Sequence, residues 1–249
     1  MDKNIVFLIN IIHDERSRGQ GYEWSIKSWE HYCKKYNCEL FVLNDPLTDI
    51  KHMAPQWYKT YIFDLLDNSE IEYDQILYVD SDTIIHPNAP NIFELSEHKF
   101  CAVPAVGSMD WICRSLETYS KFLFEGFEFP YYKYFNSGVM VMNKKHKPLF
   151  KKIQNFYKEN IDTIVHLQNN ISVGKDQPVL NYFVNRDIPD DYKVLGYEWN
   201  MQDMTRFEVI GDDFLHTKYG YISHYNAGVK PNPGYWLEKT YKHLYDNIS

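Results

Sequence analysis

Two aspartates, Asp80 and Asp82, directly follow the apolar segment ILYV, with one residue between them. If the strand that this segment predicts continues through them, both carboxylates point to one face and Ser81 points to the other. In open α/β sheets, ligands bind at the carboxyl ends of the strands. Two carboxylates converging there repel each other, and a hard divalent cation relieves the repulsion. The pair therefore indicates a metal site, although a solvated acidic turn also explains DSD.

The elements around this pair alternate in type. Short apolar, β-branched runs at residues 5–12, 38–45 and 74–82 predict buried strands. Residues 22–36 repeat large apolar side chains every three or four positions, which predicts an amphipathic helix, and residues 57–66 predict another. This β-α-β-α-β order predicts right-handed crossovers and an α/β fold, with a mainly parallel central sheet flanked by helices.

The second half of the sequence is less regular. Its expected elements are strands at 100–106 and 135–143, helices at 146–160 and 176–184, a strand or loop at 221–228, and a helix at 236–245. No linker rich in Gly, Ser or Pro divides the chain. We therefore expect one α/β unit with a soft boundary near residue 100.

The composition argues against several classes of function. Lys and Arg number 26 against 34 Asp and Glu, and no basic stripe interrupts this acidic balance, so we expect no nucleic-acid partner. The longest apolar stretch, residues 5–12, is far shorter than the ~20 residues that span a bilayer. We expect neither a transmembrane helix nor a signal peptide. Four cysteines do not make a disulfide scaffold, which favours the reducing cytoplasm.

Four motifs carry a resemblance to a known family. The segment ILYVDSDTIIHPNAPNIFEL resembles the Asp-x-Asp region of glycosyltransferases with the nucleotide-sugar-binding GT-A fold. FNSGVMVMN, KDQPVLN and HYNAGVKP are similar to later motifs of the retaining family that contains glycogenin and the bacterial lipopolysaccharide galactosyltransferases. They occur in the family's order and at similar separations. The resemblance implies a single GT-A catalytic domain, 1–249, with a nucleotide-binding half, 1–100, and a sugar- and acceptor-binding half, 101–249.

The resemblance also implies a metal site and a diphosphate contact. Asp80, Asp82 and His224 would ligate manganese, or another divalent cation such as magnesium; an imidazole beside carboxylates suits manganese better than calcium. Lys230 would contact the diphosphate of the donor, and Gly228 belongs to the same motif. Gly228 lies four residues after His224, where the family commonly has three, whereas Lys230 keeps the family's spacing. The metal and the lysine would neutralise the departing diphosphate.

Two further motifs would contact the donor sugar. By the resemblance, Asn136, Ser137 and Gly138 line the sugar pocket, and Asp176 and Gln177 approach the transferred sugar. Taken alone, Gly138 is also explained by close backbone approach in a strand, and Asp176 by helix N-capping. The resemblance implies a retaining reaction. An inverting enzyme would instead use Asp176 as the general base.

Three more residues are expected at the donor. Arg16 lies in the polar loop after the first strand, which meets the nucleotide in this fold, and its guanidinium suits phosphate. Lys59 resembles a basic residue that faces the donor in the family, or it is a solvated helical lysine. Ser81, between the two acids, is also expected to contact the donor.

Aromatic side chains are abundant, with 21 Tyr and 6 Trp. Aromatic rings stack well on sugars, so Trp111, Tyr131, Tyr132 and Trp199 are candidates for an acceptor site, although packing also explains each of them. The C-terminal stretch of aromatics and lysines suggests either weak contact with a membrane surface or a docked terminal helix.

The sequence thus predicts a metal-dependent enzyme that moves a hexose from a nucleoside diphosphate sugar, most simply a UDP-hexose, to a saccharide or glycan acceptor with retention. The alternatives are an inverting GT-A transferase, a haloacid-dehalogenase-type phosphatase, a nucleotidyltransferase and a non-enzymatic sugar-binding module. Ile84 departs from the phosphatase motif, and the loop after the first strand lacks the lysines of a nucleotidyltransferase. A binding module leaves the metal triad unexplained.

Overall fold

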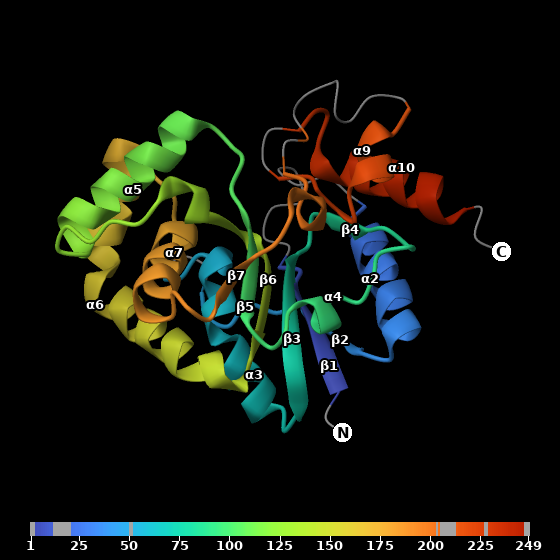
Figure 1. Ribbon diagram of the computed structural model, residues 1–249, viewed down its shortest axis with the longest axis horizontal. Helices are drawn as coiled ribbons and strands as arrows, with labels where there is room; N and C mark the ends of the chain where they lie inside the picture. Colours follow the sequence, from blue (N-terminus) through green and yellow to red (C-terminus); the bar gives the residue numbers. More distant parts are fainter. Residues whose placement is uncertain are drawn as a thin grey trace.

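A six-stranded sheet forms the centre of the computed structural model, which describes residues 3–11, 21–49, 52–202, 204, 213–226 and 229–246 (Figure 1). Its order is β2 (Glu39–Leu43), β1 (Lys3–Ile9), β3 (Tyr73–Asp80), β6 (Phe135–Asn143), β5 (Phe100–Pro104) and β7 (Tyr192–Val194). All pairings are parallel except those of β6 with β3 and β5. The mainly parallel sheet predicted from the sequence is confirmed.

Helices cover both faces of this sheet (Figure 1). One face carries η1 (Pro55–Tyr61), α3 (Ile62–Asn68), α5 (Met109–Leu123), α6 (Lys147–Ile171) and α7 (Asp176–Asp187), and the other carries α2 (Tyr22–Tyr36) and α4 (Ile92–Leu95). Alternation along β1 explains the two cores, because Phe7 packs into the first layer while Val6 and Leu8 pack against Trp29 of α2. Both faces of the strand are buried, as its sequence predicted.

A small second sheet adjoins the end of β3. It pairs β4 (Thr83–Ile85) antiparallel with β8 (Ile222–His224). Around it lie η4 (Tyr197–Trp199), α9 (Leu215–Tyr219) and α10 (Pro233–Tyr245), and elsewhere two short turns of helix occur, η2 (Tyr131–Lys133) and η3 (Lys144–His146). An apolar cluster that includes Tyr22, Ile84, Tyr225 and Leu237 joins this sheet to α2 and α10. The second sheet is therefore held firmly against the main body.

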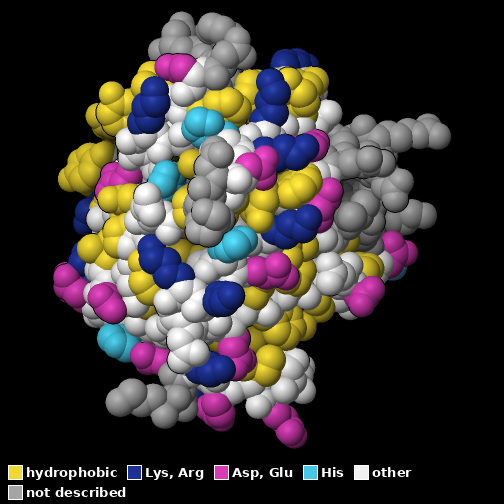
Figure 2. Space-filling model, turned by 90° about the vertical axis from the view of Figure 1, so that its right-hand side faces the viewer, with side chains coloured by type: hydrophobic (Ala, Val, Ile, Leu, Met, Phe, Trp, Pro, Cys, Tyr) yellow, Lys and Arg dark blue, Asp and Glu magenta, His cyan; other side chains and the backbone are white. Residues whose placement is uncertain are grey.

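The C-terminal helix is docked, which agrees with one of the two expectations for it. Leu237 and Tyr241 of α10 are buried, and Tyr241 stacks on Tyr245. Figure 2 views the side of the molecule that carries α2 and α10 in Figure 1, and on it Lys and Arg side chains are interspersed with Asp and Glu. Within the described residues, no helix is both long and apolar enough to cross a bilayer.

Several elements differ from the sequence prediction. The helix expected at 146–160 continues to Ile171, because Ile164 and Leu167 extend its buried stripe. The helix expected at 57–66 begins as a 3-10 turn at Pro55 and becomes α-helical only at Ile62. The helix α5 was not predicted, although Ile112, Leu116, Tyr119 and Leu123 repeat there at helical spacing. All four cysteines are unpaired, two of them buried.

Candidate active site

A cavity of about 630 Å³ opens at the edge of the sheet where β3 ends and β6 begins. Because β6 runs antiparallel to β3, its first residues lie at the same edge as the last residue of β3. The register pairs Val79 with Val139, and continuing it places Gly138 opposite Asp80. The residues predicted to bind the metal or the donor that line this central cavity are Lys59, Asp80, Ser81, Asp82, Asn136, Ser137, Gly138, Asp176, Gln177 and His224.

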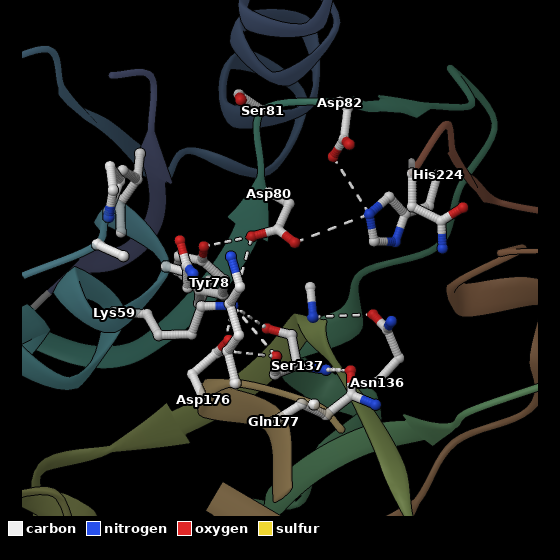
Figure 3. A pocket seen from close by; sticks show the side chains of 18 of the residues that line it. Lys59, Tyr78, Asp80, Ser81, Asp82, Asn136, Ser137, Asp176, Gln177 and His224 are labelled. Atoms are coloured by element: carbon white, nitrogen blue, oxygen red, sulfur yellow. Dashed lines mark hydrogen bonds and ion pairs between the residues drawn. The ribbon is translucent and has the colours of Figure 1, made fainter. Parts of the chain in front are cut away.

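Two carboxylates and one imidazole meet on one side of the central cavity. Figure 3 shows Asp80, Asp82 and His224 pointing toward one another. The Nε2 atom of His224 lies 3.2 Å from Asp82 Oδ1 and 3.7 Å from Asp80 Oδ2, and one ligand atom from each residue lies within 4.8 Å of the others. Adjacent oxygen or nitrogen ligands of an octahedral ion bound at about 2.1 Å are about 3 Å apart. The donor set and its spacing therefore fit a divalent cation.

Backbone pairing brings this cluster together. The strand β3 ends at Asp80 instead of continuing, and Thr83 Oγ1 donates to the carbonyl of Asp80 at 2.7 Å, which closes a tight turn. The indole of Trp29 donates to the same Thr83 hydroxyl at 3.0 Å. Thr83 pairs with His224, and the Tyr225 amide donates to the Asp82 carbonyl at 2.8 Å. The turn and β8 thus place Asp82 beside the imidazole.

The charge of the acids changes the protonation of His224. Burial lowers the pKa of this imidazole, but the carboxylates of Asp82 and Asp80 outweigh burial and raise it above its ordinary value. A proton is therefore favoured at the position that a cation would occupy. The cation and the proton would compete for the same side of the ring.

Gly138 forms the floor of the cluster. A Cβ atom built on it would lie 2.4 Å from His224 Cε1 and 2.6 Å from Asp80 Oδ2, both far too close. The backbone of β6 lies so close to His224 and Asp80 that there is room only for the hydrogen side chain of glycine at position 138. The close backbone approach that the sequence suggested for this glycine is present.

A second group of side chains, opposite this cluster, centres on a buried lysine. The Nζ atom of Lys59 lies 3.0 Å from Asp176 Oδ2 and 3.6 Å from Asp80 Oδ1, and it donates to the carbonyl of Ser137 at 3.1 Å. The side chain is only 3% exposed, so the alternative of a solvated helical lysine is wrong. Burial lowers the pKa of Lys59, but Asp176 and Asp80 outweigh it and raise the pKa above its usual value. Lys59 therefore stays charged.

The start of α7 completes this second group. Asp176 is the first residue of the helix and makes no N-cap, since Lys175 precedes it at that position. Its Oδ2 atom accepts the Ser137 hydroxyl at 2.9 Å as well as the Lys59 ion pair. The Oε1 atom of Gln177 accepts the Ser137 amide at 3.2 Å. Both side chains are therefore fixed by β6.

Some predicted residues lie elsewhere. Lys230 is exposed and is not part of the lining of the central cavity. Arg16 and Gly228 lie outside the described residues. Among the aromatic candidates, only Trp111 lines the cavity; Trp199 is buried against Tyr221 in the core, which makes an acceptor role for it wrong.

The other two aromatic candidates, Tyr131 and Tyr132, are exposed and do not belong to the cavity lining.

Two residues that were not predicted from the sequence lie at the site. The hydroxyl of Tyr78 donates to Asp80 Oδ1, and the side chain of Asn200 bonds to His224 Nδ1 at 2.9 Å. Alternation along β3 places Tyr78 on the same face as Asp80, but a lone asparagine such as Asn200 carries no sequence signal.

A comparison with known protein families gives one match. The sequence profile described as "Glycosyl transferase family 8" matches residues 15–239. No curated protein sequence matches the chain significantly.

Solved structures share the fold. A glycosyltransferase involved in the glycosylation of the major capsid of PBCV-1 superposes with a TM-score of 0.61 at 14% identity, over 95% of this chain and 99% of that one. The bifunctional glycosyltransferase WbbM gives 0.60 at 15% identity, over 98% of this chain but 50% of WbbM. An active-site mutant of LgtC gives 0.52 at 12% identity, over 97% and 96% of the two chains. These likenesses support the predicted GT-A fold.

Proposed function

The chain belongs to glycosyl transferase family 8, and from this premise we propose a metal-dependent hexosyltransferase that acts on a nucleoside diphosphate sugar with retention. The donor is a UDP-hexose and the acceptor a saccharide or glycan. The observation that carries the proposal is the meeting of Asp80, Asp82 and His224 in one cavity with Asp176 and Gln177. Family membership argues against the phosphatase, nucleotidyltransferase and sugar-binding-module alternatives.

The ion-binding side of the cavity suits manganese. Asp80, Asp82 and His224 would hold it, since two carboxylates and an imidazole form a mixed oxygen and nitrogen donor set. Bound there, a divalent cation neutralises charge on the diphosphate as the glycosidic bond breaks. The ion pair with Lys59 and the hydrogen bond from the Tyr78 hydroxyl both hold Oδ1 of Asp80, which leaves Oδ2 facing His224.

The opposite side of the cavity suits an uncharged sugar. Its polar groups are the side chains of Asn136, Ser137, Asp176 and Gln177, which line the same cavity as the acids. Carboxylate, amide and hydroxyl groups accept and donate hydrogen bonds to sugar hydroxyls. Because these side chains are already held by bonds within the site, they would orient the sugar without rearrangement.

The contacts of Asp176 and Gln177 support retention. An Asp176 base would have to take up a proton on a carboxylate whose Oδ2 is held by Lys59 and Ser137. The carbonyl oxygen of Gln177, the only nucleophile that its amide offers, already accepts the Ser137 amide. We therefore favour front-face attack: the acceptor oxygen bonds to the anomeric carbon, the bond to the diphosphate oxygen breaks, and the hydroxyl proton passes to the diphosphate.

The cellular setting follows from weaker observations. All four cysteines are unpaired, which supports the proposed reducing cytoplasm. An acceptor platform is supported at Trp111, the one aromatic candidate on the cavity wall.

The test is a panel of sugar nucleotides incubated with and without manganese and with simple saccharide acceptors. Release of free nucleoside diphosphate that depends on both metal and acceptor is the expected result, and NMR of the first product from an α-linked donor should show an α-glycoside. A β-glycoside would contradict retention and return Asp176 to the role of general base. Metal-independent transfer would contradict the proposed role of the three ligands.

A further inference from the structure

Three side chains form a hydrogen-bonded chain in the wall of the central cavity, and only the middle one, Asn200, is not part of the cavity lining. The Nδ1 atom of His224 lies 2.9 Å from Asn200 Oδ1, and Asn200 Nδ2 donates to Asn136 Oδ1 at 3.0 Å. The backbone amide of Gly138 donates to the same Asn136 oxygen at 2.9 Å. Asn200 is fully buried and is not part of the cavity lining, so it is placed to touch His224 and not a ligand.

The Gly138 amide fixes the direction of every bond in this chain. A backbone N–H can only donate, so the Asn136 atom that faces it is the carbonyl oxygen. That oxygen also faces Asn200, which must present its NH₂ group there. The remaining atom of Asn200 is then its oxygen, an acceptor, and the His224 Nδ1 atom opposite it must carry a proton.

The reverse arrangement is disfavoured. If the Asn200 amide were flipped, its oxygen would face the Asn136 oxygen at 3.0 Å. Two acceptors would then oppose each other in a buried site, and each would lose its partner. A neutral imidazole in which only one nitrogen carries a proton therefore has its lone pair on Nε2, the atom that faces Asp80 and Asp82.

The segment that carries Asn200 is held rigidly against β8. The Met201 amide donates to the carbonyl of Ile222 at 2.9 Å, and the His224 amide donates to the carbonyl of Met201 at 2.9 Å. On the other side of Asn200, the ring of Trp199 is buried and packs on Tyr221. The backbone therefore sets the distance between Asn200 and the imidazole.

The geometry points to Asn200 as a positioning residue that holds His224 in the tautomer with the proton on Nδ1, so that the Nε2 lone pair faces the cation. This inference rests on the proposed metal-dependent function. A hydrogen bond to the second nitrogen of a ligating imidazole fixes the orientation of its ring, and its loss weakens metal binding by about 10–100-fold.

Three variants separate this role from a structural one. Asn200→Leu keeps the branching and the number of side-chain heavy atoms but removes the acceptor. Asn200→Asp keeps an acceptor for Nδ1, but it places a second carboxylate oxygen opposite Asn136 Oδ1 and adds a negative charge beside His224. Asn185→Leu is the matched control, since Asn185 is another buried asparagine, bonded to a carbonyl within α7. Manganese binding is measured by EPR of the free ion. We expect Asn200→Leu to bind about 10–100-fold more weakly, Asn185→Leu to bind like the native protein, and Asn200→Asp, which keeps the acceptor, to bind more tightly than Asn200→Leu. Unchanged binding in Asn200→Leu would overturn the inference.

A second measurement needs no variant at position 200 and so does not depend on how well Asn200→Leu folds. Long-range ¹H–¹⁵N NMR of the native, metal-free protein at alkaline pH reads the tautomer of each of the ten histidines, and the signal lost in His224→Gln identifies His224. We expect a proton on Nδ1 and a pyridine-like Nε2. A proton on Nε2 would overturn the inference even in an active, metal-dependent enzyme. Failure of the native protein to bind manganese would instead contradict the proposed function, and the tautomer would still decide the role of Asn200.

Discussion

The two sides of the central cavity carry charge in different ways. The ion side, made of Asp80, Asp82 and His224, brings two carboxylates to one imidazole, and the nearest lysine contact is 3.6 Å from one of them. The sugar side, made of Asn136, Ser137, Asp176 and Gln177, pairs its one carboxylate with the buried ammonium of Lys59 at 3.0 Å. By the proposed function, an external cation would complete the ion side, whereas the charges of the sugar side are already paired within the protein. Under the proposed function, the ion side would receive the charged diphosphate and the sugar side the uncharged sugar.

The strongest test of this contrast is Asp82→Asn. Removing one negative ligand should abolish manganese binding at micromolar concentrations and lower transfer by at least about 10²-fold, because the diphosphate charge is no longer neutralised. The melting temperature should stay close to native, since asparagine has nearly the same shape as aspartate. Asp74→Asn is the control, an exposed aspartate on β3, the strand that precedes the turn with Asp82. Native turnover at limiting manganese in Asp82→Asn would remove this residue from the metal site.

The sugar side should respond in stability as well as in activity. Lys59→Met leaves the buried Asp176 carboxylate without its partner and should lower the free energy of unfolding by about 3–5 kcal/mol in denaturant titrations. Adding Asp176→Asn should restore much of the stability, because the uncompensated charge is gone, but not the activity. If Lys59→Met unfolded like the native protein, the ion pair would not be what orders this side.

Gly138→Ala should disturb the ion side by steric overlap, without changing any charge. The added methyl group collides with His224 and Asp80, so we expect a loss of about 1–3 kcal/mol of stability together with weaker manganese binding. Gly107→Ala is the control, since a Cβ there meets nothing within 4 Å. Native manganese affinity in Gly138→Ala would mean that the two ligands can move apart without consequence.

Manganese affinity should also depend on pH. The pKa of His224 is raised above its usual 6.5, so the imidazole is protonated, and the ion is excluded, below that raised value. Manganese affinity should be constant at pH values above this raised pKa. Below the pKa it should fall by about tenfold for each pH unit, because one proton must leave when one ion binds. Isothermal titration across a pH range of about 5.5–8.5 would check this, since affinity that stayed flat down to the usual 6.5 would contradict the raised pKa.

The smallest effect is expected at Lys230. Its side chain is exposed and outside the cavity lining, so Lys230→Ala should raise the donor KM by less than about fivefold, equivalent to an exposed contact of about 1 kcal/mol. Steady-state kinetics with the donor varied would measure it. A much larger rise in the donor KM would show that Lys230 contacts the diphosphate in the complex and belongs with the ion side.

The sequence predicted those parts of the molecule that depend on local pattern. The helix α2 and the strand β6 have the predicted boundaries, because apolar residues repeat there with a helical or a strand period. The helix α5 was not predicted although Ile112, Leu116, Tyr119 and Leu123 repeat at helical spacing, so its local pattern was available in the sequence.

In the site, too, some residues could be predicted from the local sequence and others could not. Asp80 and Asp82 are visible in the sequence because acids abruptly end an apolar strand, and family resemblance supplied His224. The partners of Lys59 and the role of Asn200 were not predictable, since they depend on side chains that only the folded chain brings together. Local periodicity says nothing about such long-range contacts.

The pairing of β4 with β8 has a consequence for how the enzyme is made. Asp80 and His224 are separated by more than half the length of the chain, so a nascent protein can form β1, β2 and β3 long before its third ligand leaves the ribosome. Metal affinity should appear only after the segment that carries β8 has been synthesised. A partly synthesised chain would therefore carry both aspartates but could not yet bind the ion. It could not consume an activated sugar before the protein is complete.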